Sequence, residues 1–119
     1  MDPFPEQWEL ISLFEGEPTL LDPGVPWFYN RVTFVLRRDG ERIDCAIEAA
    51  DHLLDFRWSI HDRTVVRLQL ANVVGLAVRQ TPESEGLTIT TSPAELGSLY
   101  VQVSPQVAVI WASDSAPTG

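Results

Sequence analysis

The clearest pattern in the chain is the alternation of apolar and polar positions between residues 28 and 49. In the first part, one face of a strand would carry Phe28, Val32, Phe34 and Leu36. Residues 43–49 alternate in the same way, and Asp39-Gly40 separates the two runs. Because Gly40 adopts a positive φ at little cost, this pair is typical of a tight turn. The pattern predicts a β-hairpin.

The same alternation continues in shorter runs toward the C-terminus. It predicts strands at residues 54–60, 64–70, 76–80, 87–91, 99–103 and 107–112, with Pro93 and Pro105 between the last of them. Near the N-terminus, Leu10, Leu13 and Phe14 have helical spacing. We therefore expect a short helix over residues 5–15, ended by Gly16.

These elements predict a mainly β chain of the α+β class. We expect about seven or eight short, mostly antiparallel strands and one N-terminal helix. They would form a curved sheet, a sandwich or a partly open barrel. The length of 119 residues suits one domain, which we place at 1–112, followed by a flexible tail at 113–119.

Charge and composition exclude several functions. The chain has 8 basic and 17 acidic residues, a formal charge of −9, which disfavours nucleic acids and anionic membranes. No apolar run is long enough for a membrane helix, and residues 1–6 have no basic segment typical of a signal peptide. A single cysteine cannot form an internal disulfide. We expect a cytoplasmic protein.

The acidic residues are concentrated in the first part of the chain. Residues 1–55 contain twelve acids and four arginines, a balance of −8, whereas residues 56–119 have a balance of −1. This excess is either a solvated face or a surface that attracts a basic partner. All eight basic residues are arginines, which can form bidentate pairs with neighbouring carboxylates.

Few residues suggest catalysis or metal binding. His52 and His61 flank one predicted strand and would lie too far apart to act together. Cys45 falls on the apolar face of the hairpin, where we expect a buried thiol. The spacing of Cys, His and acidic residues fits neither zinc nor an EF-hand. We expect no cofactor, no metal and no enzymatic activity.

The aromatic residues offer two interpretations. On an alternating strand, Phe28 would face inward, leaving Trp27 and Tyr29 on the other face. There they would be covered by a second layer or would anchor a partner. We expect the remaining tryptophans in the core: Trp8, Trp58 and Trp111.

One layout extends over most of the chain. It runs from Trp8-x-x-x-x-Leu13-Phe14 through Pro18-x-Leu20, Val32-x-Phe34-x-Leu36-x-Arg38, Val66-x-Leu68-x-Leu70-x-Asn72-Val73-x-Gly75-Leu76 and Leu87-x-Ile89. It resembles the small acidic immunity proteins of bacterial polymorphic toxin systems, in particular the family numbered fifty. The resemblance implies a non-catalytic inhibitor that binds and caps a cognate toxin inside the producing cell.

The leading hypothesis is therefore an immunity protein that occludes the active site of a basic toxin. The expected partner-binding residues are Asp39, Glu41, Asp44, Glu48, Asp51, Asp55, Trp27 and Tyr29. An alternative is an assembly module that forms a homodimer through a sheet edge at residues 107–112. A third is a small-molecule binder whose barrel mouth is lined by Trp27, Trp58 and Trp111.

Overall fold

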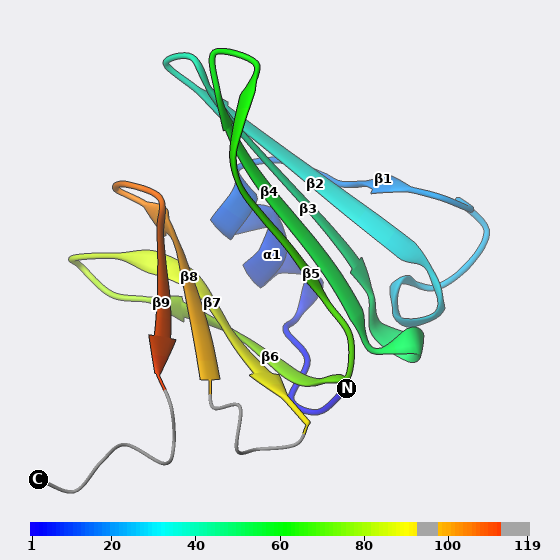
Figure 1. Cartoon of the computed structure of the whole chain (residues 1–119). Coiled ribbons are helices and arrows are strands. Elements are labelled where there is room, and N and C mark those ends of the chain that lie inside the picture. Colours follow the sequence, from blue (N-terminus) through cyan, green and yellow to red (C-terminus); the bar gives the residue numbers. More distant parts are fainter. Residues whose placement is uncertain (93–97, 113–119) are drawn as a thin grey trace, which may run out of the picture. The chain divides into compact units, whose positions relative to one another are not determined.

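The computed structural model describes residues 1–92 and 98–112. The predicted C-terminal tail and Pro93 lie outside the described residues. The chain divides into two compact units, one of Phe14–Ala71 and one of Met1–Leu13 with Asn72–Gly119. Each unit contains one antiparallel sheet (Figure 1). The assignment of a single domain to residues 1–112 stays a prediction.

The unit of Phe14–Ala71 contains a five-stranded sheet, here called sheet A, in which each strand pairs with the next along the chain. Its strands are β1 (Thr19–Leu20), β2 (Arg31–Arg38), β3 (Glu41–Glu48), β4 (Leu53–Ile60) and β5 (Arg63–Leu70). The predicted hairpin is confirmed as β2 and β3, with Arg38 opposite Glu41 at the turn.

Two hairpins of sheet A close through tight two-residue turns. Asp39 and Gly40 have φ of 42° and 81°, and His61 and Asp62 have φ of 47° and 64°. Positive φ at both central positions matches the twist of the flanking strands. The His61 N–H donates to the Gly40 carbonyl at 2.8 Å. A Cβ on Gly40 would lie 2.6 Å from His61 Cε1, so the imidazole ring occupies the space that glycine leaves open.

The alternation predicted for sheet A separates a buried face from an exposed one. The buried face carries Val32, Phe34, Leu36, Ile43, Cys45, Ile47, Leu54 and Phe56. Phe14 stacks on Phe34 with ring centroids 4.9 Å apart, and Trp27 meets Phe34 edge-on at 5.9 Å. Cys45 is fully buried, as predicted, and this burial raises the pKa of its thiol to about 12.

The predicted strand start at Phe28 is wrong. Trp27–Tyr29 forms a short 3₁₀ turn, η1, and the strand begins at Arg31. The N–H groups of Tyr29 and Asn30 bond to the carbonyls of Pro26 and Trp27, which closes this turn before the sheet begins. A second 3₁₀ turn, η2 (Ala49–Asp51), connects β3 to β4. Trp27 and Tyr29 therefore do not alternate as strand residues.

The other unit contains the four-stranded sheet B, also in chain order. Its strands are β6 (Val73–Gln80), β7 (Glu85–Thr91), β8 (Ser98–Ser104) and β9 (Ala108–Ala112). The predicted helix is α1 (Gln7–Phe14), whose Leu10 and Leu13 are fully buried. The residues before this helix lie alongside β6 and bond to its backbone. The Asp2 N–H donates to the Val74 carbonyl and the Leu76 N–H donates to the Pro3 carbonyl, both at 2.8 Å.

The prediction of an antiparallel β chain with one N-terminal helix is confirmed, with two open sheets in the described residues. Two tryptophans predicted for the core are exposed instead: Trp8 to 65% and Trp111 to 53%. Trp8 lies off the helix face that Leu10 and Leu13 share, and Trp111 lies on an outer strand with a neighbour on one side only. The small-molecule site lined by Trp27, Trp58 and Trp111 stays a prediction. In the part that the structure describes, no helix is long and apolar enough to cross a membrane.

Candidate functional site

The exposed face of sheet A gathers most of the arginines in the chain. Each strand presents alternate residues there, opposite to the buried apolar ones. The register places five arginines on this face, which we call the arginine face: Arg31, Arg37, Arg42, Arg57 and Arg67. Three acids lie among them: Asp44, Glu48 and Asp55. In a chain of charge −9, this surface has an excess of basic residues.

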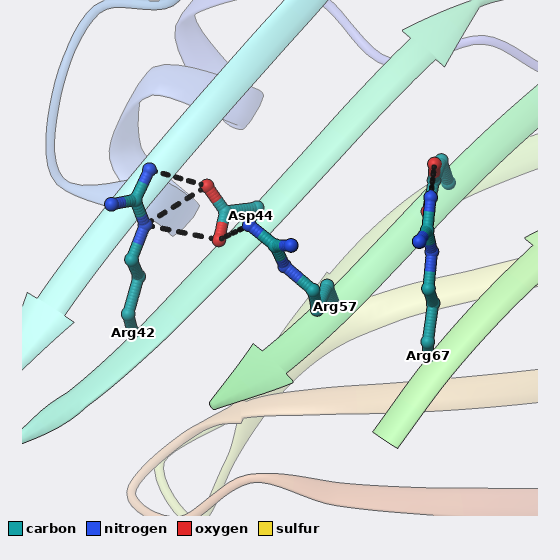
Figure 2. Close-up of polar contacts among 5 residues, drawn as sticks. Arg42, Asp44, Arg57 and Arg67 are labelled. Carbon is teal, nitrogen blue, oxygen red and sulfur yellow. Dashed lines mark hydrogen bonds and ion pairs between the residues drawn. The ribbon is translucent and has the colours of Figure 1, made fainter. Parts of the chain in front are cut away.

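Asp44 lies at the centre of the arginine face. Arg42 donates to it from both Nε and Nη2, with Nη2 2.9 Å from Oδ1, and this hydrogen bond raises the pKa of Arg42. Arg57 approaches Asp44 Oδ2 from the neighbouring strand at 3.5 Å. Figure 2 shows the two guanidinium groups on either side of the carboxylate. One acid is therefore shared by two arginines.

The other two acids of the face are also paired. Arg31 Nη1 lies 2.9 Å from Glu48 Oε2, and Arg67 Nη2 lies 3.2 Å from Asp55 Oδ2. The side chains of both arginines remain well exposed, at 39% and 52%. Three of the acids predicted to bind a basic partner are thus already compensated by arginines on their own face.

Asp39 and Glu41 lie at the turn end of sheet A. They line an open hollow of about 620 Å³ together with residues of both hairpins. The basic residues of its lining are Arg37, Arg38, Arg42 and Arg57. The hollow also contains His61 and Asp62 from the second turn, so residues about twenty positions apart in sequence come together. It is a polar surface depression of mixed charge.

Tyr29 and Asp51 meet at the opposite end of sheet A. They line a hollow of about 280 Å³ with Glu48. Tyr29 is 71% exposed, which suits an anchor for a partner. Asn30, which is buried, holds this end in shape because its Nδ2 donates to the carbonyls of Asp22 and Val25 at 2.6 and 2.9 Å. Asn30 was not singled out by the sequence analysis.

The eight predicted binding residues therefore separate into three places within one unit. Asp44, Glu48 and Asp55 share the arginine face, Asp39 and Glu41 lie at one end, and Tyr29 and Asp51 lie at the other. Trp27 is half-buried against Phe34, and its role as an anchor stays a prediction. The arginines were not predicted from the sequence as a group. Alternation within the predicted hairpin already placed Arg31, Arg37 and Arg42 on its polar face.

Nothing in the described residues gathers for metal or nucleophilic chemistry. No group of three or more His, Cys, Asp or Glu side chains could hold a metal ion in residues 1–92 and 98–112. The raised pKa of Cys45 keeps its thiol protonated at neutral pH, and a protonated thiol is a poor nucleophile. The arrangement is instead suited to charge-assisted hydrogen bonds with another molecule.

Comparison with known proteins gives one structural likeness. No protein-family model and no curated protein matches the sequence. Among solved structures, the chain is similar to a chain of the contact-dependent growth inhibition toxin–immunity protein complex from Klebsiella pneumoniae 342. The TM-score is 0.77 at 15% identity, covering 92% of this chain and 94% of that chain. The chain therefore has the fold of that chain, and membership of the family numbered fifty stays a prediction.

Proposed function

We propose that this chain is an immunity protein, which neutralises a bacterial toxin by binding it. The observation that carries the proposal is the likeness to a chain of a toxin–immunity protein complex over nearly the full length of both chains. Of the two roles in such a complex, toxin and immunity protein, the small size and acidic composition of this chain support the second. A net charge of −9 suits a protein that captures a basic partner.

A binding role without catalysis fits the chemistry of the described residues. The pKa values of Arg42 and Cys45 are both raised. Both shifts stabilise the ordinary form at neutral pH, a charged guanidinium and a protonated thiol. Catalytic groups usually show the opposite, with pKa values brought toward the working pH. The charged face of sheet A is instead equipped for recognition.

We further propose that binding occludes the active site of a basic toxin. Acids that form no ion pair with a described residue are the ones best placed to attract basic groups. Among the predicted residues these are Asp39, Glu41 and Asp51. They lie at the two ends of sheet A, with Tyr29 exposed beside Asp51. Acids that face a positively charged cleft speed association with it.

The test is co-expression with the protein encoded by the neighbouring reading frame. That protein is produced in a host strain with and without this chain, and growth and complex formation are measured. We expect growth arrest by the neighbour alone, rescue by co-expression, and a stable complex on gel filtration. Arrest that continues in the presence of this chain, with no complex, would overturn the proposal.

A second candidate is a homodimer formed through sheet B. The outer strand β9 exposes Val109, Ile110 and Trp111, at 37%, 50% and 53%. An exposed apolar outer strand can pair with another copy. Light scattering distinguishes the two: a dimer at all concentrations that is lost in Ile110→Glu supports assembly, and a monomer excludes it.

A further inference from the structure

The arginine face contains like charges that directly oppose one another. Arg37 on β2 pairs in register with Arg42 on β3, and Arg57 on β4 pairs with Arg67 on β5. Directly opposite side chains on antiparallel strands are close, and like charges there reduce stability. Two such pairs occur on one face of one sheet. Ion pairs with Asp44 and Asp55 account for Arg42, Arg57 and Arg67, whereas no ion pair within the described residues accounts for Arg37.

Arg37 makes this arrangement clearest. It is exposed, and its side chain forms no ion pair or hydrogen bond with any residue that the structure describes. Its opposite neighbour Arg42 is already engaged by Asp44. Both arginines line the open hollow at the turn end of sheet A. Their side chains therefore lie next to each other at the rim of this hollow, which Arg38 and Arg57 line as well, together with the acids Asp39, Glu41 and Asp62.

The surroundings fit a protein surface better than a small ion or a nucleic acid. Val35, which pairs with Asp44, is 38% exposed, and Leu53 on the same face is also 38% exposed. Exposed apolar side chains among arginines suit a protein interface, in which arginine is enriched. A polynucleotide would be repelled by the net charge of −9. The hollow is also open rather than enclosed around a small ligand.

We propose that the arginine face docks a carboxylate-bearing segment of the toxin, with Arg37, Arg42 and Arg57 as the principal contacts. This inference rests on the proposed function and adds to it. The partner would present acids to these arginines and basic groups to Asp39, Glu41 and Asp51. Guanidinium groups suit this role because they bind carboxylates through two parallel hydrogen bonds. Mixed charge of this kind selects one partner against others.

The test compares Arg37→Glu with Arg63→Glu, a matched control. Arg63 pairs with Ile60, one position beyond Ser59, and so alternates to the other face of the same sheet. Affinity for the toxin of the neighbouring reading frame is measured by calorimetry. We expect Arg37→Glu to weaken binding by about 10-fold or more, because a carboxylate of the partner then meets a like charge. Arg63→Glu should stay within about 2-fold of the unchanged protein.

A stability measurement separates recognition from folding. Arg37→Glu places a carboxylate opposite Arg42, so the urea midpoint should stay equal or rise while affinity falls. Loss of both stability and affinity would assign Arg37 a structural role and overturn the inference. Equal affinities of the two variants would also overturn it, and would leave the immunity function intact.

A second probe tests the face without the toxin. Poly-L-glutamate and a polyuridylate RNA are titrated at low salt while the arginine Nε–H signals are followed by NMR. We expect poly-L-glutamate to shift the signals of Arg37, Arg42 and Arg57 and to leave Arg63 unchanged. A stronger response to the RNA, or shifts spread over all arginines, would overturn the choice of a carboxylate. If the toxin does not bind but these shifts occur, the proposed function fails and the docking face stands.

Discussion

The two units of the molecule carry their charge in different ways. The unit of Phe14–Ala71 contains ten acids and seven arginines, a balance of −3. The other unit contains seven acids and one arginine, a balance of −6. That single arginine, Arg79, lies over the ring of Tyr100 at 5.6 Å. One unit thus has charges of both signs on one sheet face, and the other is acidic with little compensation.

This difference changes how the acidic composition is interpreted. When the chain is divided by position, the excess of acids falls in residues 1–55 and points to that part as the attracting surface. Divided by unit, the same residues include the hairpin whose acids are paired with arginines. A mixed surface supports specific contacts, whereas uncompensated charge mainly supports solubility and steering. We therefore expect sheet A to provide recognition.

The largest effect on stability is expected at a glycine of sheet B. A Cβ on Gly86 would lie 2.3 Å from the Val101 carbonyl oxygen, which is backbone and cannot move aside. Gly86→Ala should lower the free energy of unfolding by about 3 kcal/mol. Gly40→Ala in sheet A meets only the end of the His61 side chain, with a positive φ of 81°, and should cost about 1 kcal/mol. Urea denaturation measures both, and equal losses would contradict this.

Asn30→Ala should lower the free energy of unfolding by about 2 kcal/mol, less than Gly86→Ala does. The side chain donates to two carbonyls and accepts from the Asp22 N–H at 3.2 Å, and the substitution leaves these groups without their partner. The hollow lined by Tyr29 should also become less ordered. Gln69→Ala, on an exposed position of the same sheet, is the control and should cost little. Hydrogen exchange at residues 22–25 that is unchanged in Asn30→Ala would refute the role of this side chain.

Removing acids should change the stability of the protein in opposite directions, depending on which unit the acids come from. The variant of sheet A combines Asp44→Asn, Glu48→Gln and Asp55→Asn. The control in the other unit combines Asp2→Asn, Glu6→Gln and Glu83→Gln. The first variant leaves the five arginines of the arginine face without their acids, and its free energy of unfolding should fall by about 1 kcal/mol at low salt. The second reduces repulsion and should gain slightly or not change. Thermal unfolding at low and high salt measures the contrast, and two losses of equal size would contradict it.

The smallest effect at neutral pH is expected for Cys45. Its folded pKa of about 12 exceeds its ordinary value of 9.0, chiefly through burial and further through Asp55 and Asp44. The associated stability is therefore complete below pH 9 and is lost as the pH rises from 9 toward 12. Cys45→Ala should lack this alkaline decline. Labelling of the thiol in the native protein should follow global unfolding, and rapid labelling at pH 8 would contradict full burial.

Much of the fold could be predicted because its signals are local. Alternation placed the hairpin strands near their observed positions, and Asp39-Gly40 specified the turn between them. The start of β2 was missed because η1 forms through backbone bonds after Pro26, while Phe28 happened to match the alternation. Trp111 was misplaced because burial depends on whether a strand has neighbours on both sides, which its own sequence does not encode.

The sequence by itself determined the elements, the acidic balance and the burial of Cys45, since each follows from residue type and period-2 alternation. Only the tertiary structure decided which charges meet. Glu48 lies 17 positions from Arg31, and Arg57 lies 13 positions from Asp44, yet each pair forms an ion pair across neighbouring strands. Strand register brings such residues within a few ångströms, and a shift of one position would turn every side chain to the other face. For that reason arginines from four strands, in an acidic chain, meet on one face of sheet A in the folded protein.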